Sequence, residues 1–436
     1  MSLKKNILFI ALFLGAFYSK AQEKLTLNEA IQQALKNNYD IKIVNNNAEI
    51  SKNNVNLGNA GMLPRLTGDA STGGGISNSV LTNSSGVERT VNGAKNTNFS
   101  YGVNLGWTLF DGFQMFTNYE RLKELQKLGE IGIRTAVLNT VSDVIIGYYD
   151  LARQQKLIIA RDTAIDISNF RLKLAQNKLD IGRGSKLDVL TAEVDYNADT
   201  ALYLQLKNNA KQSMINLNRL MARDPNIIFE VDQQLDSDLN LNLTDLMNQA
   251  ATLNPIIQNS VINNRIAELN LKATKGQKLP VVQLNSGYNF NRSMTPTGFN
   301  QQMRSNGFTY GFSASINIFN GNLQKQNERN AKIEIKNTEL SLSQAKESVN
   351  AQILTAYRTY DTGKELLNLE NKNVEIARQY LDITLEKYRL GSISPLDVRD
   401  AQIAYLAALT RHVEAQFQVK LNEITLKEIS GTLNIQ

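Results

Sequence analysis

Residues Phe99–Gly112 read FSYGVNLGWTLFDG. This stretch decides the fold because apolar side chains alternate with small or polar side chains along most of it. From Phe99 to Leu109 the odd positions are apolar, whereas the even positions are small or polar, which is the pattern of a strand with one apolar face. The alternation returns in residues 308–318, FTYGFSASINI. Each copy has about eleven residues, enough for a tilted strand to cross the hydrocarbon layer of a bilayer. A half-buried strand of a soluble sandwich would show the same alternation, so the rest of the chain has to decide.

Aromatic residues lie toward the ends of these stretches and of the segment before the second one. Rings at strand ends are typical of the aromatic girdles of membrane barrels, and we expect these side chains to face lipid. The candidates are Tyr101, Trp107, Phe110, Tyr288, Phe308, Tyr310, Phe312 and Phe319.

Residues 1–21 have the composition of a secretory signal peptide. Lys4 and Lys5 precede an apolar run, and the small residues Ser19 and Ala21 occupy cleavage positions, so the mature chain is expected to begin near Gln22. Loss of three lysines lowers the net charge from +6 to +3, and no basic run with interleaved aromatics follows, so the sequence does not predict nucleic-acid binding.

The residue types needed for catalysis or metal binding are scarce. The chain has no cysteine and one histidine, His412, which we expect on the surface; neither a histidine metal cluster nor a catalytic triad can form. No G-x-S-x-G or P-loop motif occurs, and we expect no cofactor. After the signal no apolar run reaches the ~18 residues of a membrane-spanning helix, so the exported chain is periplasmic, secreted or an outer-membrane barrel.

Long helices are predicted because prolines are rare. None lies between Pro64 and Pro225, and residues 113–178 keep an apolar spacing of three and four. A helix of about 65 residues would be roughly 100 Å long, which suits a coiled coil rather than a globular core. A returning helix is expected over 187–222. Before the first strand we expect one helix over 25–58, a weak strand over 66–72 and an exposed loop over about 74–97; a second such loop is expected over 292–306.

The chain then repeats this order. Leu63-Pro64 matches Leu279-Pro280 at an offset of 216, and beyond the loop the offset is 209, as Tyr101-Gly102 against Tyr310-Gly311 shows. We therefore predict a first repeat over 22–225, an equatorial linker over 226–240 and a second repeat over 241–436. Four strands cannot close a barrel, and open sheet edges in lipid are costly, so the chain must oligomerise. Two copies would give 8 strands with an interior filled by side chains, and three copies would give 12 strands, which could hold an aqueous lumen.

Several motifs resemble the TolC-like outer-membrane factor family. They are the opening LTLNEAIQQALKNN (25–38), the strand ends LFDG (109–112) and IFNG (318–321), and the helix turns IGRGSKLDV (181–189) and LGSISPLDV (390–398). The resemblance implies a mostly α homotrimer with a joint 12-stranded membrane β-barrel and a periplasmic α-barrel of long coiled-coil hairpins.

The same resemblance implies a function and partners. The chain would be the passive exit duct, in the outer membrane of a Gram-negative bacterium, of a tripartite efflux pump or type I secretion system. Its partners would be a periplasmic adaptor protein, an inner-membrane RND or ABC transporter, and outer-membrane lipid. A periplasmic coiled-coil scaffold without a pore is the alternative.

The resemblance also assigns roles to the two helix turns. The adaptor would dock at Ile181, Gly182, Arg183, Leu390, Gly391 and Ser392, although the glycines are equally explained as helix C-caps. Asp397 and Asp400 match an acidic ring at the periplasmic gate, and Asp188 and Tyr388 match partners in tip-closing hydrogen bonds. Acidic residues are also ordinary in a first helical turn. Ile393 stands where the family can carry a basic residue, which leaves Arg183, Arg389 and Arg399 as substitutes.

Overall fold

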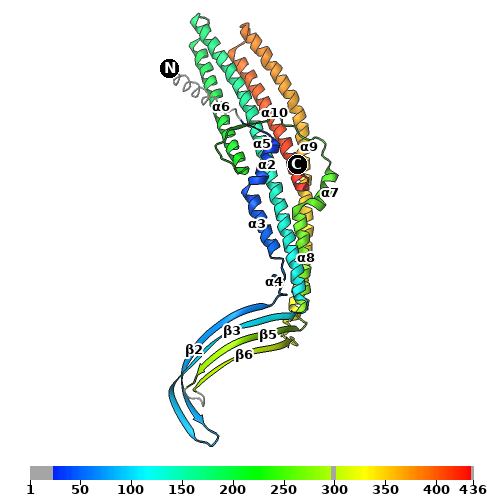
Figure 1. Cartoon of the computed structure of the whole chain (residues 1–436). Coiled ribbons are helices and arrows are strands. Elements are labelled where there is room, and N and C mark those ends of the chain that lie inside the picture. The colour runs from blue at the N-terminus through cyan, green and yellow to red at the C-terminus, as the bar shows by residue number, and fades with distance from the viewer. Residues whose placement is uncertain (1–22, 296–300, 434–436) are drawn as a thin grey trace, which may run out of the picture. The chain divides into compact units, whose positions relative to one another are not determined.

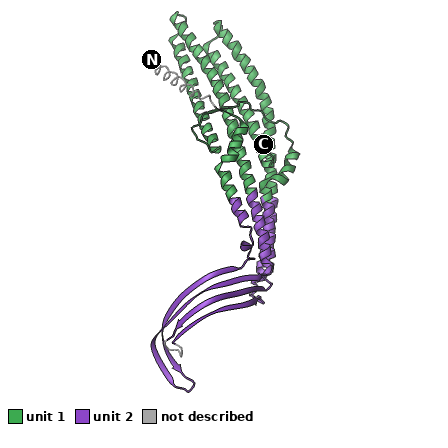
Figure 2. Cartoon of the chain, in the orientation of Figure 1, with its two compact units in different colours: residues 1–46, 131–258, 344–436 green, residues 47–130, 259–343 purple. Residues whose placement is uncertain are grey.

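The computed structural model describes residues 23–295 and 301–433, so the expected signal peptide lies outside the described residues. The chain divides into two compact units (Figure 2). Unit 1 contains residues 1–46, 131–258 and 344–436, and unit 2 contains residues 47–130 and 259–343. The two longest helices, α5 (Gln114–Asp180) and α9 (Leu323–Arg389), have 67 residues each and contribute to both units. The proline-free interval therefore forms the long helix that its apolar spacing predicts.

Unit 2 contains a curved antiparallel sheet of four strands in the order β2-β3-β5-β6 (Figure 1). The strands are β2 (Arg65–Thr82), β3 (Glu88–Phe110), β5 (Val281–Met294) and β6 (Gln302–Ser315). The register follows the alternation in the sequence, because Tyr101 lies opposite Phe290 on the apolar face. On the other face, the Asn104 amide donates to Asp69 at 2.9 Å, and Asn289 donates to Asn104 at 3.2 Å. The prediction of two hairpins, each with one polar face, is confirmed.

The loop expected over 74–97 is mostly strand, so that expectation was wrong. Of the loop expected over 292–306, residues 292–294 and 302–306 are strand, and residues 296–300 lie outside the described residues. β2 and β3 remain paired to Thr82 and Glu88, and only residues 83–87 turn between them. The Asn83 side chain accepts from the amides of Ser85 and Val87 and closes this turn. Glycine, serine and asparagine suggested a loop, but backbone pairing between the two strands holds these residues extended.

The second strong strand ends earlier than its sequence predicts. β6 stops at Ser315, so Ile316, Ile318 and Phe319 lie beyond the sheet. Ser315 pairs with Val281, the first residue of β5. Within the described residues, β5 therefore has no further residue that could pair with Ile316 and the residues after it. In the first repeat Phe110 stays within β3 because it pairs with Val282.

Unit 1 is built mainly of helices. They are α2 (Leu27–Asn37), α6 (Lys186–Leu220), α7 (Leu243–Leu253) and α10 (Pro395–Ser430), together with parts of α5 and α9. A short parallel pair joins β1 (Glu23–Leu25) to β4 (Phe229–Val231). The fully buried core side chains include Leu25, Val141, Val144, Leu151, Leu217 and Phe229.

The single helix expected over 25–58 is interrupted, and the cause is an asparagine that appears in both repeats. Asn38 separates α2 from α3 (Tyr39–Asn53); a four-residue helix, α4 (Leu57–Ala60), follows. The side-chain oxygen of Asn38 accepts from the backbone amides of Asp40 and Ile41, and its side-chain amide donates to the Leu220 carbonyl.

In the second repeat Asn254 separates α7 from α8 (Pro255–Gly276) in the same way. It accepts from Ile256 and Ile257 and donates to the Ile429 carbonyl. Each asparagine thus caps a new helix and ties it to the end of a returning helix. Across the described parts of the chain, every helix is too short or too polar to cross a membrane.

Candidate functional site: the two helix turns and the exposed sheet

Both long helices end in the same hydrogen-bonded turn. Gly182 has a φ of 71° and Gly391 a φ of 77°, the left-handed conformation that glycine adopts most easily. In each turn the glycine amide donates three residues back, and the next amide donates five residues back, which is the Schellman arrangement. The glycines are therefore structural caps.

The same turns also present an open surface. A Cβ atom added at Gly182 or Gly391 would meet nothing within 4 Å. Their neighbours Ile181 and Leu390 are 68% and 83% exposed. Apolar side chains this exposed, held by a fixed backbone turn, are available for contact with another protein.

Two predicted gate carboxylates cap the returning helices. Asp188 accepts from the Ser185 amide at 3.1 Å, and Asp397 accepts from the Ser394 amide at 2.9 Å. Each serine side chain accepts from the amide of its aspartate in return, so both sites are capping boxes. Asp400 lies one turn further along α10 and is exposed, and among the described residues it has no hydrogen-bond or ion-pair partner.

Tyr388 is buried in the last turn of α9. The Lys178 ammonium lies 4.7 Å from its ring centroid, so the ring packs against the end of α5. Burial raises the pKa of the Tyr388 phenol, and the negative charge of Asp188 acts in the same direction, while Arg171 opposes them. Within the described chain Tyr388 and Asp188 do not form the expected hydrogen bond with each other.

A buried polar network near the turns was not predicted from the sequence. The Arg399 guanidinium on α10 donates to Asp199 on α6 at 2.7 Å and lies 3.5 Å from Asp195. Arg171 on α5, 3% exposed, donates to Asp195 at 3.0 Å and to the Pro395 carbonyl at 3.3 Å. Three helices therefore share one set of alternating charges.

Neutral groups complete this network. The Ser168 hydroxyl donates to Asp199 at 2.5 Å, and the Gln402 amide donates to the Ala164 carbonyl at 2.9 Å. Ser168, Asp199 and Gln402 are each at most 1% exposed. We call Ser168, Arg171, Asp195, Asp199, Arg399 and Gln402 the buried network.

The structure distinguishes the three arginines considered as replacements for a basic residue at position 393. Arg399 belongs to the buried network. Arg389 pairs with Glu386 on its own helix and lies over the Phe170 ring at 5.6 Å. Arg183 forms no ion pair within the described residues.

One feature of the sequence did point to the buried network. Asp195 and Asp199 lie one helical turn apart on α6, beside Ala192, which is buried.

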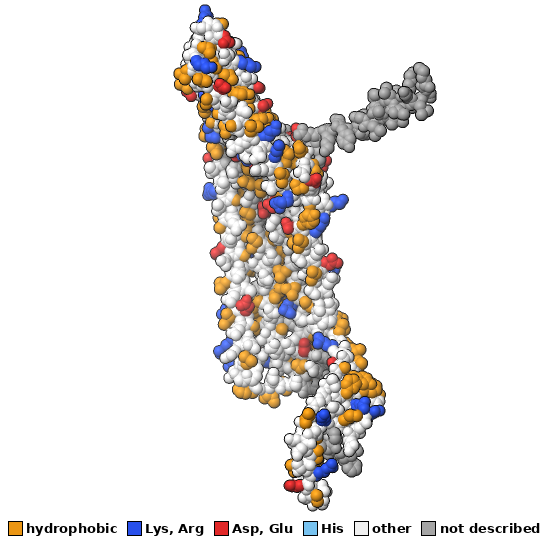
Figure 3. Space-filling view, turned by 90° about the vertical axis from the view of Figure 1, so that its left-hand side faces the viewer, with side chains coloured by type: hydrophobic (Ala, Val, Ile, Leu, Met, Phe, Trp, Pro, Cys, Tyr) orange, Lys and Arg blue, Asp and Glu red, His pale blue; other side chains and the backbone are white. Residues whose placement is uncertain are grey.

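Seven of the eight predicted strand aromatics lie on the strands of the sheet, whereas Phe319 lies beyond the end of β6. Tyr101 stacks on Phe290 with ring centroids 4.8 Å apart, and Phe308 lies 5.9 Å from Tyr310. Near the other end of β3, the Trp107 indole donates to the Met62 carbonyl. On β6 the exposed fractions reach 77% for Tyr310 and 71% for Phe312. In Figure 3 hydrophobic side chains are scattered among polar ones over the face of the molecule that is shown.

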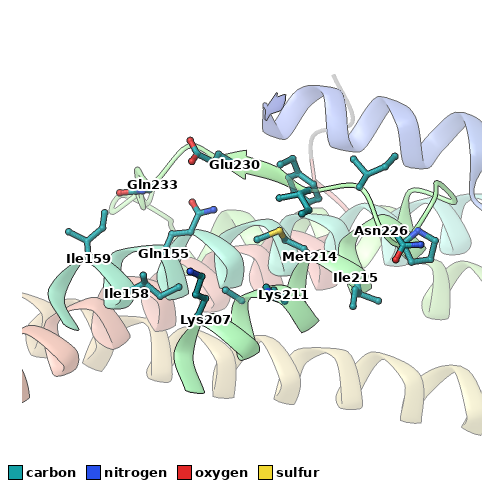
Figure 4. Close-up of a pocket in the computed structure, with 15 residues that line it drawn as sticks. Gln155, Ile158, Ile159, Lys207, Lys211, Met214, Ile215, Asn226, Glu230 and Gln233 are labelled. Atoms are coloured by element: carbon teal, nitrogen blue, oxygen red, sulfur yellow. The ribbon is translucent and has the colours of Figure 1, made fainter. Parts of the chain in front are cut away.

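A groove of about 660 Å³ lies in unit 1 between α5, α6 and residues 225–233 (Figure 4). Its walls are mainly apolar, with Ile158 and Met214 among them and Lys207 and Lys211 on α6. Glu230 contributes an acidic side chain to the same lining.

His412 is half-buried rather than at the surface as expected, and burial lowers its pKa. No cluster of metal-binding side chains occurs among the residues that the structure describes.

Comparisons with known proteins agree with this architecture. The family model described as outer membrane efflux protein matches residues 30–223 and 246–432. Outer membrane efflux protein BepC of Brucella suis is 20% identical over 98% of this chain and 91% of its own length. Outer membrane protein TolC of Escherichia coli is also 20% identical, over 98% of this chain and 86% of its own length. The outer membrane channel CmeC of Campylobacter jejuni superimposes with a TM-score of 0.76 at 18% identity, covering 93% of this chain and 86% of that one.

The fold is that of an outer-membrane channel subunit. The chain belongs to the outer membrane efflux protein family, because the family model matches most of its length in two stretches. It is a TolC-like channel protein of the Gram-negative outer membrane that extends into the periplasm, and it is a passive conduit rather than an enzyme.

Proposed function

We propose that three copies of this chain form the exit duct of a tripartite efflux pump. The observation that carries the proposal is the sheet, in which β2 and β6 have no strand partner on their outer sides among the described residues of the single chain. Unpaired edges in lipid would cost several kcal/mol per group, so the edges must meet those of neighbouring copies. Twelve strands would close a barrel with the aromatics toward lipid and the asparagines and glycines toward water.

The repeats form the structural units of this assembly. Residues 22–225 and 241–436 would each contribute one hairpin of the barrel and one pair of long helices, and residues 226–240 would connect them at the equator. Alternation of the two repeats around the axis would give the trimer six similar helical hairpins.

The helix turns would form the periplasmic end. A periplasmic adaptor protein would dock on the exposed residues of the two turns, Ile181, Gly182, Arg183, Leu390, Gly391 and Ser392, and would connect the duct to an inner-membrane transporter. An efflux role is favoured over type I secretion because the matching family and BepC are both described as efflux proteins. The inner-membrane partner would be an RND or an ABC transporter.

We propose that the gate combines an acidic ring with the buried network. Asp397 and Asp400 of three copies would place six carboxylates around one mouth, which favours cations. Tyr388 and Asp188 would take part in closing this mouth. Within one copy Arg399 holds α10 against α6, and Arg171 and Gln402 hold it against α5, which would limit how far α10 can move outward.

The carboxylates can be tested by electrical recording. The double variant Asp397→Ala/Asp400→Ala should lose cation selectivity and conduct more than the native channel in planar bilayers, since six charges leave the mouth. Because Asp397 also caps α10, Asp397→Asn/Asp400→Asn, in which the amide oxygen can still accept from the cap, serves as the control for helix stability. Unchanged current and selectivity in both variants would remove these residues from the gate.

A further inference from the structure

Two arginines face each other on adjacent strands near the end of the sheet. Arg292 on β5 and Arg304 on β6 are directly paired in the register. Like charges in such a pair destabilise a sheet unless something negative lies between them. This pair therefore requires an explanation that the strand pattern alone does not provide.

The two guanidinium groups converge on one oxygen atom. With the Gln302 amide turned to present its oxygen, that oxygen accepts from Arg304 Nε at 2.9 Å, from Arg304 Nη2 at 3.1 Å and from Arg292 Nε at 3.2 Å. A neutral amide oxygen satisfies hydrogen bonds but does not offset two positive charges. Within residues 23–295 and 301–433 neither arginine has a carboxylate partner.

The location of the pair indicates which anion would fit. Because side chains alternate along β5, Arg292 lies on the same face as Tyr288 and Phe290. On β6 the same face carries Arg304, followed by Phe308 and Tyr310. The arginines therefore lie immediately beyond the aromatic rows, on the side nearer the β5–β6 connection.

This end of the sheet is the one distant from the long helices. β5 follows α8 and β6 leads to α9 at the opposite end of the sheet, so the arginine end would face the cell exterior in the proposed barrel. Aromatic girdles mark the level of lipid headgroups, and the phosphate layer lies just outside them. A third cation, Lys95, lies on the same face of β3, two residues beyond Thr97, which pairs with Met294.

We propose that Arg292 and Arg304 bind a phosphate group of an anionic glycolipid in the outer leaflet. Guanidinium groups bind phosphate through two parallel hydrogen bonds, and two of them converging on one point can hold several phosphate oxygens at once. Gln302 occupies in the free protein the position that a phosphate oxygen takes in the complex. The inference rests on the proposed barrel, which sets this face against lipid.

The test is native mass spectrometry of the full-length protein in detergent with added bisphosphorylated lipid A. The bound fraction should fall about tenfold or more in Arg292→Gln/Arg304→Gln. It should be unaffected in the matched control Arg329→Gln/Arg358→Gln, which removes two exposed arginines of α9. Arg292→Lys/Arg304→Lys keeps both charges and should retain most of the binding, which separates loss of the anion site from local misfolding. Dephosphorylated lipid A should bind the native protein and the glutamine variant equally.

Two results would overturn the proposal. Equal lipid A binding by the native protein and the glutamine variant would remove the arginines from any lipid site. Complete competition by millimolar inorganic phosphate would assign the site to free phosphate rather than to lipid. The same spectra report the oligomer, so a monomeric mass would contradict the proposed trimer while the comparison of variants still decides the arginine site.

Discussion

At the scale of single residues, the buried network is the feature most open to test. Arg399 is the cation nearest to Asp199, which is 1% exposed. Removal of one partner from a buried ion pair typically costs about 3–5 kcal/mol, because the other charge remains without compensation. Arg399→Met should therefore weaken the attachment of the first turns of α10 to α6.

Hydrogen exchange measures this local attachment directly. In Arg399→Met the amides of residues 395–405 should exchange faster than in the native protein, while those in the middle of α10 should not change. Adding Asp199→Asn should restore part of the protection, since no uncompensated buried charge then remains. Native protection in the single variant would show that the pair does not hold α10 in place.

Glu428 is expected to make the stability of the folded protein depend on pH. Burial raises its pKa, Asp143 adds to the rise, and the hydrogen bond donated by Ser142 partly offsets it. A raised pKa means that the folded state favours the protonated form, so this contribution to stability is present at acid pH and lost as pH rises through the folded pKa. Glu428→Gln stays neutral at every pH and can still accept from Ser142.

Thermal unfolding across a pH series should reveal the difference. Near pH 8 the variant should unfold at a slightly higher temperature than the native protein, and the two should converge below the ordinary glutamate pKa of 4.5. Glu375→Gln, at an exposed position on α9, should show no such difference. A native protein that is the more stable of the two at pH 8 would contradict the assignment.

At the scale of elements, the two repeats provide pairs of equivalent residues whose substitutions can be compared. Gly112 and Gly321 occupy equivalent positions after the last strand of each hairpin, with φ of 73° and 69°. A Cβ at Gly112 would overlap the Gly276 backbone, whereas a Cβ at Gly321 would meet nothing within 4 Å of this chain. Alanine should cost about 1–2 kcal/mol at either position through the left-handed backbone, and more at Gly112 through the clash.

The yield and thermal stability of the detergent-extracted protein compare these two variants. Gly112→Ala should lower both more than Gly321→Ala does. Equal losses would mean that the backbone conformation, and not the close approach to Gly276, is what requires glycine.

Gly182 and Gly391, the glycines of the two helix turns, can be tested with larger side chains because both are open to solvent. Gly182→Glu/Gly391→Glu should abolish export in cells while leaving the oligomer intact, since a charge would then occupy the proposed adaptor-docking surface. Gly86→Glu is the control, because Gly86 also has positive φ and open surroundings but lies in the β2–β3 turn. Loss of the oligomer in the tip variant would make these glycines structural alone.

Elements with a strong period were predictable from the sequence, whereas elements fixed by partners were not. The alternation around Tyr101 predicted β3, and the scarcity of proline predicted α5. The extension of β2 through its glycines and serines depends on pairing with β3, and the break at Asn38 depends on the Leu220 carbonyl of a distant helix. The buried network could not be predicted from the sequence for the same reason, because its charged side chains come from three different helices.

At the scale of the whole molecule, the single chain is incomplete. Its sheet exposes large aromatic side chains and leaves both outer strands without partners, and its longest helices carry exposed apolar residues such as Leu340 and Ile376. Such surfaces are stable only against lipid or further copies of the chain. The proposed trimeric duct would satisfy both requirements with one kind of subunit.

Electron microscopy of the protein extracted from outer membranes in mild detergent, with the oligomer mass determined on the same sample, tests this account most directly. The account predicts a threefold particle with a detergent belt around the strands and a helical tube projecting from one side of that belt. A monomer, or a particle without a detergent belt, would contradict it.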